Sequence, residues 1–389
     1  MQKLTSPMRK AAFRAARHAA LLVVAVVSSS LLLAACDLTG GGHDDSGPGS
    51  ACTGFPQGAD SVRSVMAQLA RYQADIIANP RAGWQQAVYY LGTVEAYRAT
   101  CDSLYLRQAT GWAKALDWQP GTRKYPRHAN NLAPSQVYLE LYEIEREEHR
   151  LAPTRTLMER FPNDPVRGRA LWDRVDALFM AGPVFAQLHG ILEKRAGEQS
   201  PYAAQLDSMY WDAARYLQNE DEPLFYRDAE FFGTDVFWGR GNGWIIASIP
   251  RILEHDLPWA DRVRYRRLLK RMAGALAELQ RAEDGLWGSD LKDPYRFENP
   301  ETSASALFTY AIAWGINEGV LPEETYGPVV RRAWAGLSRA VTPEGHMRWV
   351  EQPGSRPKPQ RLRGGGRPYE YGSGTFLMAG SEMLRYTAQ

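Results

Sequence analysis

The residue best suited to acid–base chemistry is Asp176. It lies in an apolar run, with Val175 before it and Leu178 and Phe179 close behind. Burial disfavours the ionised form of a carboxyl group, so the pKa of Asp176 should rise and the group could hold a proton near neutral pH. A general acid needs such a proton. A buried Asp that caps a helix or pairs with an Arg is the alternative, and the local sequence leaves both open.

A glycine-rich segment before a predicted helix is a second candidate, and it reads Phe237-Trp238-Gly239-Arg240-Gly241-Asn242-Gly243-Trp244. Its alternating glycines would let the backbone approach a ligand closely. Trp238 and Trp244 offer apolar platforms, and the planar guanidinium of Arg240 matches a carboxylate. No Lys-Ser/Thr pair follows, which excludes a phosphate loop. We predict that these three side chains bind an acidic sugar, with a tight turn of packed tryptophans as the alternative.

Three further segments carry polar or aromatic residues ahead of predicted helices. In the first, which begins at Arg127, the residues His128, Asn130 and Asn131 are good partners for hydroxyl groups, although all three are also ordinary turn and cap residues. In the second, Tyr371 is predicted either to line a cleft or to form a plain helix entry. The third is Glu301-Thr302-Ser303-Ala304-Ser305-Ala306, where Thr302 or Ser303 most simply caps a helix.

The elements that must position these residues are predicted to be almost all helical. Apolar residues recur at helical spacing from a helix capped by Asp60 onward. The further predicted helices cover approximately 84–99, 102–117, 134–150, 167–180, 184–196, 202–219, 243–254, 260–282, 302–318, 323–341 and 374–388. Short β segments are expected only near 286–297 and 346–352. Because no repeat of fixed period is present, we expect a closed (α/α)6 toroid rather than a solenoid.

The N-terminal stretch has the pattern of a targeting segment. Five basic residues precede an apolar run from Ala19 to Ala35, which is short for a membrane span. The run ends in Leu33-Ala34-Ala35-Cys36, which resembles a bacterial lipobox, and a Gly/Ser/Asp-rich tether follows. We therefore expect a signal peptide over 1–35, a lipid anchor at Cys36, a tether over 36–56 and a catalytic domain over 57–389. The mature protein would face the periplasm or exterior of the cell envelope.

Composition narrows the possible partners. Hydrophobic residues make up 44% and charged residues 23% of the 389-residue chain, and the net charge of +2 argues against nucleic acid. Seven His without ligand spacing argue against a metal. Cys52 and Cys101 could form a disulfide in an oxidising compartment or remain two thiols. No obligate protein partner and no cofactor are indicated.

The motifs together, in their order along the chain, resemble the unsaturated rhamnogalacturonyl hydrolases of glycoside hydrolase family 105 and the related unsaturated glucuronyl hydrolases of family 88. The resemblance extends from about residue 60 to the end. It rests on Asp176-Ala177-Leu178-Phe179-Met180-Ala181-x-Pro183, Phe237-Trp238-x-Arg240-Gly241-Asn242-Gly243-Trp244, Asp284-Gly285-Leu286-Trp287, Glu301-Thr302-Ser303-Ala304-Ser305-Ala306 and Tyr371-Gly372-Ser373-Gly374.

The resemblance implies an (α/α)6 barrel and a hydrolase that removes a 4,5-unsaturated uronic acid from lyase-generated oligosaccharides, of pectin or rhamnogalacturonan type. It implies that Asp176 protonates C4 of the vinyl ether and helps water add at C5. The chain departs from the pattern at Asn130 and Asn131, where relatives commonly carry an acid, and an amide cannot share a proton. A non-catalytic sugar-binding lipoprotein on the same fold is therefore the alternative, and another (α/α)6 enzyme such as an epimerase or lyase lacks its usual His pair here.

Overall fold

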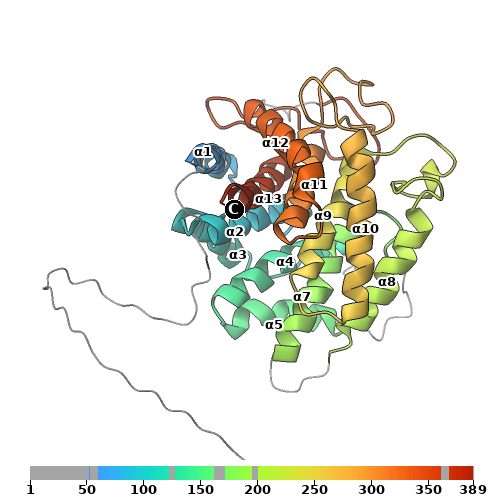
Figure 1. Ribbon diagram of the computed structural model, residues 1–389. Helices are drawn as coiled ribbons and strands as arrows, with labels where there is room; N and C mark the ends of the chain where they lie inside the picture. The colour runs from blue at the N-terminus through green and yellow to red at the C-terminus, as the bar shows by residue number, and fades with distance from the viewer. Residues whose placement is uncertain are drawn as a thin grey trace, which may run out of the picture. The chain divides into compact units, whose positions relative to one another are not determined.

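The computed structural model describes residues 52, 60–121, 128–161, 171–194, 200–360 and 368–388 (Figure 1). Over these ranges the chain is helical and contains no strand, only three isolated β-bridges. The helices are α1 (Asp60–Ile76), α2 (Trp84–Thr100), α3 (Ser103–Ala115), α4 (Ala129–Ile144), α5 (Glu148–Met158), α6 (Asp176–Met180), α7 (Gly182–Lys194), α8 (Tyr202–Leu217), α9 (Gly239–Leu253), α10 (Trp259–Glu278), α11 (Thr302–Asn317), α12 (Glu323–Ala340) and α13 (Glu370–Thr387).

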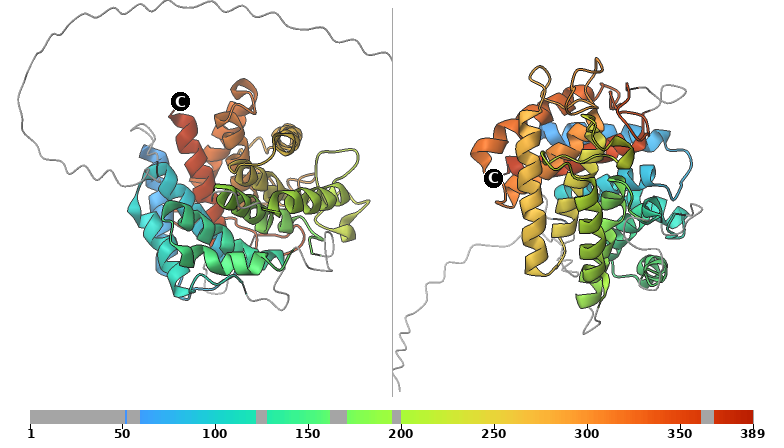
Figure 2. Two further views of the ribbon diagram at one scale, coloured as in Figure 1. Left: turned by 90° about the horizontal axis from the view of Figure 1, so that it is seen from below. Right: turned by 90° about the vertical axis from the view of Figure 1, so that its right-hand side faces the viewer.

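Six helices form a closed inner ring. Each of α2, α4, α7, α9, α11 and α13 packs against the next, and α13 returns to α2. The helices that precede them along the chain pack outside this ring (Figure 2); they are α1, α3, α5, α8, α10 and α12. The short α6 lies between α4, α7 and α9. This arrangement is six helical hairpins closed into a toroid, so the predicted (α/α)6 barrel is confirmed.

The inner helices approach one another closely because small residues stand at their contacts. A Cβ atom added at Gly374 of α13 would overlap the backbone carbonyl of Val88 in α2. A Cβ at Gly241 of α9 would lie 2.8 Å from the ring of Trp238 and 3.2 Å from the side chain of Val175. Gly241 and Gly374 therefore allow close packing at these two positions, and the approach of a ligand to the glycines of segment 237–244 stays a prediction.

Several predicted element boundaries are corrected. The helix expected over 134–150 ends at Ile144, and α5 follows from Glu148. Helices α4, α9 and α13 begin four or five residues earlier than expected, so that the His128, Arg240 and Tyr371 segments form their first turns or caps. Glycine and asparagine disfavour a helix interior by propensity, and tertiary packing overrides that preference here. The expected β segments amount to isolated bridges, Trp238 with Asp290 and Val341 with Met347.

Cys52 and Cys101 form a disulfide that ties the start of the described chain to the end of α2. Their Cα atoms are 5.3 Å apart and their sequence separation is 49 residues. A cross-link over a loop of this length stabilises the fold mainly by restricting the unfolded chain. None of the described helices is long and apolar enough to cross a membrane.

A buried ion cluster joins the C-terminal halves of three inner helices. Arg251 of α9 is fully buried and donates to Glu95 of α2 and Glu140 of α4. Burial opposes the ionisation of Glu140, but Arg98 and Arg251 outweigh it and lower its pKa to about 2. Glu140 is therefore held ionised by these two arginines, whereas burial raises the pKa of Glu95 although Arg251 opposes the rise.

Arg251→Met should destabilise the protein, because it leaves the carboxylates of Glu95 and Glu140 buried without their shared cation. Breaking a buried pair in this way costs roughly 3–5 kcal/mol. Denaturant unfolding of the variant measures the loss. Arg331→Met, which removes an exposed ion pair with Glu323, is the control and should unfold close to the wild type; equal stability of the two variants would contradict the assignment.

Candidate active site

The first turns of the inner helices meet at one end of the barrel through aromatic contacts. The ring of Trp84, at the start of α2, lies 4.9 Å from that of Tyr371 in α13 and 6.1 Å from that of Trp244 in α9. Trp244 in turn lies 4.9 Å from Phe179 of α6. Because the Arg251 cluster occupies the opposite ends of α2, α4 and α9, the predicted site motifs gather at one end of the ring.

Asp176 is the first residue of α6, and its side chain keeps 19% of its surface exposed. Its Oδ2 lies 3.6 Å from Nε of Arg227 and has no hydrogen-bond partner. The preceding Val175 donates its N–H to the carbonyl of Arg227 at 3.1 Å, which fixes the two segments together. Burial raises the pKa of Asp176, and Arg227 and Arg240 only partly oppose this rise. The site thus holds a carboxyl group poised to carry a proton.

Arg240 is a buried anchor. Its Nη1 donates to the carbonyl of Glu351 at 2.8 Å and its Nη2 to the carbonyl of Gln352 at 2.9 Å. The guanidinium carbon also stands 4.7 Å from the ring centroid of Trp238 and 5.2 Å from that of Tyr371. With its side chain 1% exposed, Arg240 holds the segment 351–352 across the starts of α9 and α13, and its role as a ligand for a substrate carboxylate stays a prediction.

Glu351 is another buried carboxyl group of the site, and no motif of the sequence pointed to it. Its Oε2 accepts from Nε1 of Trp238 at 2.9 Å and from Oγ of Ser289 at 2.7 Å. Burial raises its pKa to about 7, with Arg240 opposing and Glu301 adding to the rise. Because the pKa of Glu351 is raised as well, any pH profile of this site must separate it from Asp176.

The cap of α11 is Glu301, where Thr302 or Ser303 was expected. Its carboxylate accepts from the N–H groups of Ser303 at 3.2 Å and Ala304 at 2.5 Å, and from the N–H of Glu351 at 2.9 Å. Thr302 instead donates its hydroxyl to the carbonyl of Arg348 at 2.7 Å. This cap thus binds the helix start and the segment around Glu351 together.

The predicted aromatic platforms are packed inside. Trp238 is 2% exposed, and Trp244 and Tyr371 are fully buried. Tyr371 donates its hydroxyl to the carbonyl of Glu351, which adds to the anchoring by Arg240. Direct stacking of a sugar on these rings stays a prediction. Trp84, which the sequence did not single out, is only half-buried and covers two of them.

The start of α4 carries the predicted hydroxyl-binding set, while Arg127 lies outside the described residues. His128 caps α4, its Nδ1 accepting from the N–H of Asn130 at 3.2 Å. Asn131 is 1% exposed and its carbonyl accepts from Gly121 at 2.9 Å. Gln136, further along α4, donates to the carbonyl of Phe179 at 2.8 Å and so places this turn beside α6. The binding roles of His128, Asn130 and Asn131 stay predictions.

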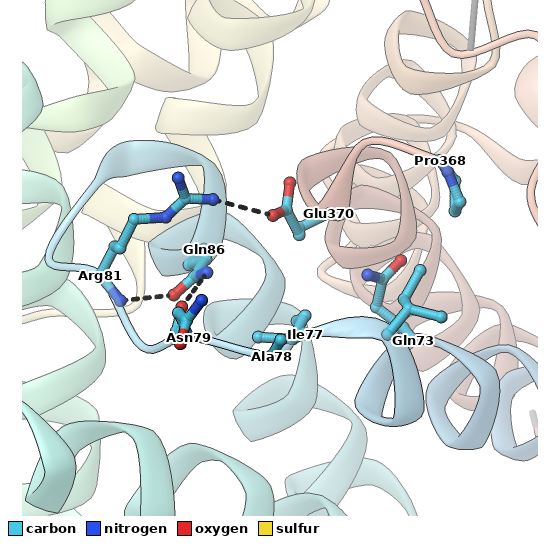
Figure 3. A pocket seen from close by; sticks show the side chains of 9 residues that line it. Gln73, Ile77, Ala78, Asn79, Arg81, Gln86, Pro368 and Glu370 are labelled. Atoms are coloured by element: carbon cyan, nitrogen blue, oxygen red, sulfur yellow. Dashed lines mark hydrogen bonds and ion pairs between the residues drawn. The ribbon is translucent and has the colours of Figure 1, made fainter. Parts of the chain in front are cut away.

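A polar hollow lies beside the same end, between the end of α1 and the starts of α2 and α13 (Figure 3). It measures about 480 Å³, including space open to solvent. Arg81 and Glu370 face each other across it at 3.8 Å. Gln86 shapes its wall by accepting from the N–H of Arg81 and donating to the carbonyl of Asn79. The paired charges suit the hollow to an uncharged ligand rather than to an anion.

Among the described residues, no group of three or more His, Cys, Asp or Glu side chains is placed to hold a metal ion.

Arg227, which faces Asp176, was also missed at the sequence level, because it belongs to none of the motifs. No spacing rule connects it to Asp176, 51 positions away by subtraction of their residue numbers (227 − 176).

Comparisons with known proteins agree with this geometry. The chain is 31% identical over 337 residues to an unsaturated 3S-rhamnoglycuronyl hydrolase of Formosa agariphila, a match that covers 80% of this chain and 86% of that protein. Its fold superposes on a family 88 glycosyl hydrolase from Bacteroides vulgatus with a TM-score of 0.76 at 27% identity, covering 85% of this chain and all of that one.

A possible family 105 member from Salmonella enterica shares the fold with a TM-score of 0.73 at 21% identity, covering 85% of this chain and 96% of that one. The predicted resemblance to these two families is therefore confirmed. The family model described as Glycosyl Hydrolase Family 88 matches residues 59–387, nearly the whole described part. The chain belongs to glycosyl hydrolase family 88.

Proposed function

We propose that this protein hydrolyses lyase-generated oligosaccharides by releasing the 4,5-unsaturated uronic acid from their non-reducing end, with Asp176 as the general acid. The observation that carries the proposal is the carboxyl group of Asp176, which is half-buried, has a raised pKa and stands where the inner helices of a family 88 barrel begin. One such carboxyl group is enough for this chemistry, unlike the paired carboxylates of ordinary glycosidases.

The reaction begins at the vinyl ether. Asp176 delivers its proton to C4, and the positive charge that develops at C5 is shared with the ring oxygen. The carboxylate left on Asp176 then takes a proton from a water molecule as that water adds at C5. The product is a hemiketal, which opens to a ketone and leaves two oxygens on C1. Loss of the neighbouring sugar from C1 completes the cleavage, with one water consumed.

The neighbouring sugar is proposed to be rhamnose. The relative from Formosa agariphila is named an unsaturated 3S-rhamnoglycuronyl hydrolase. This name supports a linkage between the uronic acid and rhamnose more directly than it supports a pectin-derived substrate. The charge-balanced hollow between Arg81 and Glu370 offers room for an uncharged part of the oligosaccharide. A panel of ulvan-, rhamnogalacturonan- and glycosaminoglycan-lyase products, followed by loss of double-bond absorbance, ranks these substrates.

The alternative of a non-catalytic sugar-binding protein is not favoured. Asn130 and Asn131 motivated it, but Asn131 is buried and its backbone holds Gly121 in place. The proton donor itself is present and has the raised pKa that the reaction needs.

Asp176→Asn should lower kcat by roughly 100- to 10,000-fold, because an amide cannot deliver a proton to carbon. Loss of double-bond absorbance measures the rate. Asp173→Asn is the matched control: this carboxylate is three residues away by number and accepts from Arg174 at 2.7 Å, so it should retain most of the activity. Wild-type turnover by the Asp176 variant would remove Asp176 from the mechanism.

The raised pKa of Asp176 sets the alkaline limb of the pH profile. Since the acid form is the active one, kcat/KM should fall as pH rises through that pKa, at a value above the usual Asp range of about 3.9. Glu351, with a pKa of about 7, could produce a similar limb. If the alkaline limb reflects Asp176, the Glu351→Gln variant should keep it. Loss of the limb in this variant would assign the titration to Glu351.

We also propose that the mature protein is held in the cell envelope by acylation of Cys36. The apolar run ending in Leu33-Ala34-Ala35-Cys36 supports this. The disulfide between Cys52 and Cys101 supports export, because disulfides persist in oxidising compartments.

Cys36→Ser expressed in a bacterial host should shift the protein out of the membrane fraction and abolish labelling by a radioactive fatty acid. Activity towards the oligosaccharide should persist, because Cys36 precedes the region that the family model matches. A Cys36→Ser protein that stays in the membrane fraction would contradict the anchor.

A further inference from the structure

We propose that Arg227 binds the carboxylate of the unsaturated uronic acid and so determines the specificity of the site for an acidic sugar. The inference rests on the proposed function, since it concerns the substrate of Asp176. No motif of the sequence contains Arg227; its position comes from the tertiary contact with Asp176.

Three arginines act electrostatically on Asp176, and two of them are committed elsewhere. Arg240 donates through both terminal nitrogens to backbone carbonyls and is 1% exposed. Arg174 forms a two-pronged pair with Asp173 at 2.7 and 2.8 Å. Arg240 is thus too buried to meet a substrate carboxylate, and the Nε–Nη2 edge of Arg174 is occupied by Asp173.

Arg227 differs from both. Its Nη1 pairs with Asp228, whereas its Nε, which faces Asp176 at 3.6 Å, has no hydrogen-bond partner. The facing atoms of Arg227 and Asp176 are buried, yet their side chains are 14% and 19% exposed, so the exposed surface belongs to their other atoms. Both side chains therefore keep some surface that a ligand can reach. A carboxylate is the natural partner for a guanidinium in this state.

The chemistry of the substrate requires this proximity. In the unsaturated ring, C4 receives the proton and its bonded neighbour C5 carries the carboxylate. The acid and the carboxylate anchor must consequently stand side by side, as Asp176 and Arg227 do. When the substrate carboxylate arrives, its negative charge offsets the cation of Arg227, and the anionic form of Asp176 loses its main stabilising partner. Binding thereby helps Asp176 to retain its proton until the transfer.

Asp228 positions the anchor. Its Oδ2 accepts from Arg227 while its Oδ1 accepts from the N–H of Glu230 at 3.0 Å, which caps the short helix from Ala229 to Phe231. The carbonyl of Arg227 is bound by Val175, one residue before the acid. The side chain and backbone of Arg227 are thus both fixed relative to Asp176, as a pre-organised binding group requires.

The test compares the free acid of the substrate with its methyl ester, in which the negative charge is absent. The wild type should prefer the acid, and Arg227→Gln should reduce the acid-to-ester ratio of kcat/KM by roughly 10- to 100-fold, the loss of a hydrogen bond to a charged group. The intrinsic reactivity of the ester cancels when this ratio is compared between variants. Arg174→Gln is the matched control and should keep the wild-type ratio.

Arg227→Lys addresses folding. Because lysine retains the cation, this variant should recover part of the preference for the acid. Its unfolding midpoint should match that of Arg227→Gln, so that a difference in stability does not explain the difference in preference. A preference unchanged in Arg227→Gln, or lost equally in Arg174→Gln, overturns the inference. Absence of turnover by the wild type on any unsaturated substrate would instead reject the proposed function, so the two failures are distinguishable.

Discussion

The buried guanidinium of Arg240 is the interaction on which the active-site end depends. Its two terminal nitrogens hold the carbonyls of Glu351 and Gln352, and its face lies against Trp238 and Tyr371. One side chain thus joins the starts of α9 and α13 to the segment that crosses them. Burying such a charge is costly unless opposite charges lie near it, and the carboxyl groups of Glu301 and Glu351 lie 3.9 and 3.8 Å from its Nη1.

The same helix carries the anchor of the opposite end. Arg251 is eleven residues after Arg240 (251 − 240), which is close to three helical turns, so both side chains project from one face of α9. Arg251 binds Glu95 and Glu140 from two other helices of the ring, whereas Arg240 binds the backbone of Glu351 and Gln352 between α12 and α13. Helix α9 is therefore fixed inside the barrel at both ends, by the polar contacts of Arg240 and of Arg251, with apolar packing between them.

This rigidity has a consequence for the chemistry. Asp176 belongs to a helix too short to be stable alone, and it keeps its place because Val175 is bound by Arg227 and packed against Gly241. The carboxyl group of Asp176 is largely shielded from water but forms no close ion pair. Arg227 lies 3.6 Å from it and also pairs with Asp228. A weaker pairing leaves the pKa raised, which a proton donor to carbon requires.

The sequence by itself determined the all-helical barrel and singled out Asp176, because helical periodicity and an Asp inside an apolar run are local patterns. It also placed Trp238, Arg240 and Tyr371 in one site, and it did not show that these side chains are packed inside the barrel end. Only the tertiary structure identified Arg227 and Glu351 and chose a disulfide for Cys52 and Cys101. The reason is physical: these contacts join residues distant in the chain, and a side chain's partners are set by how the helices close on one another, which no local pattern encodes.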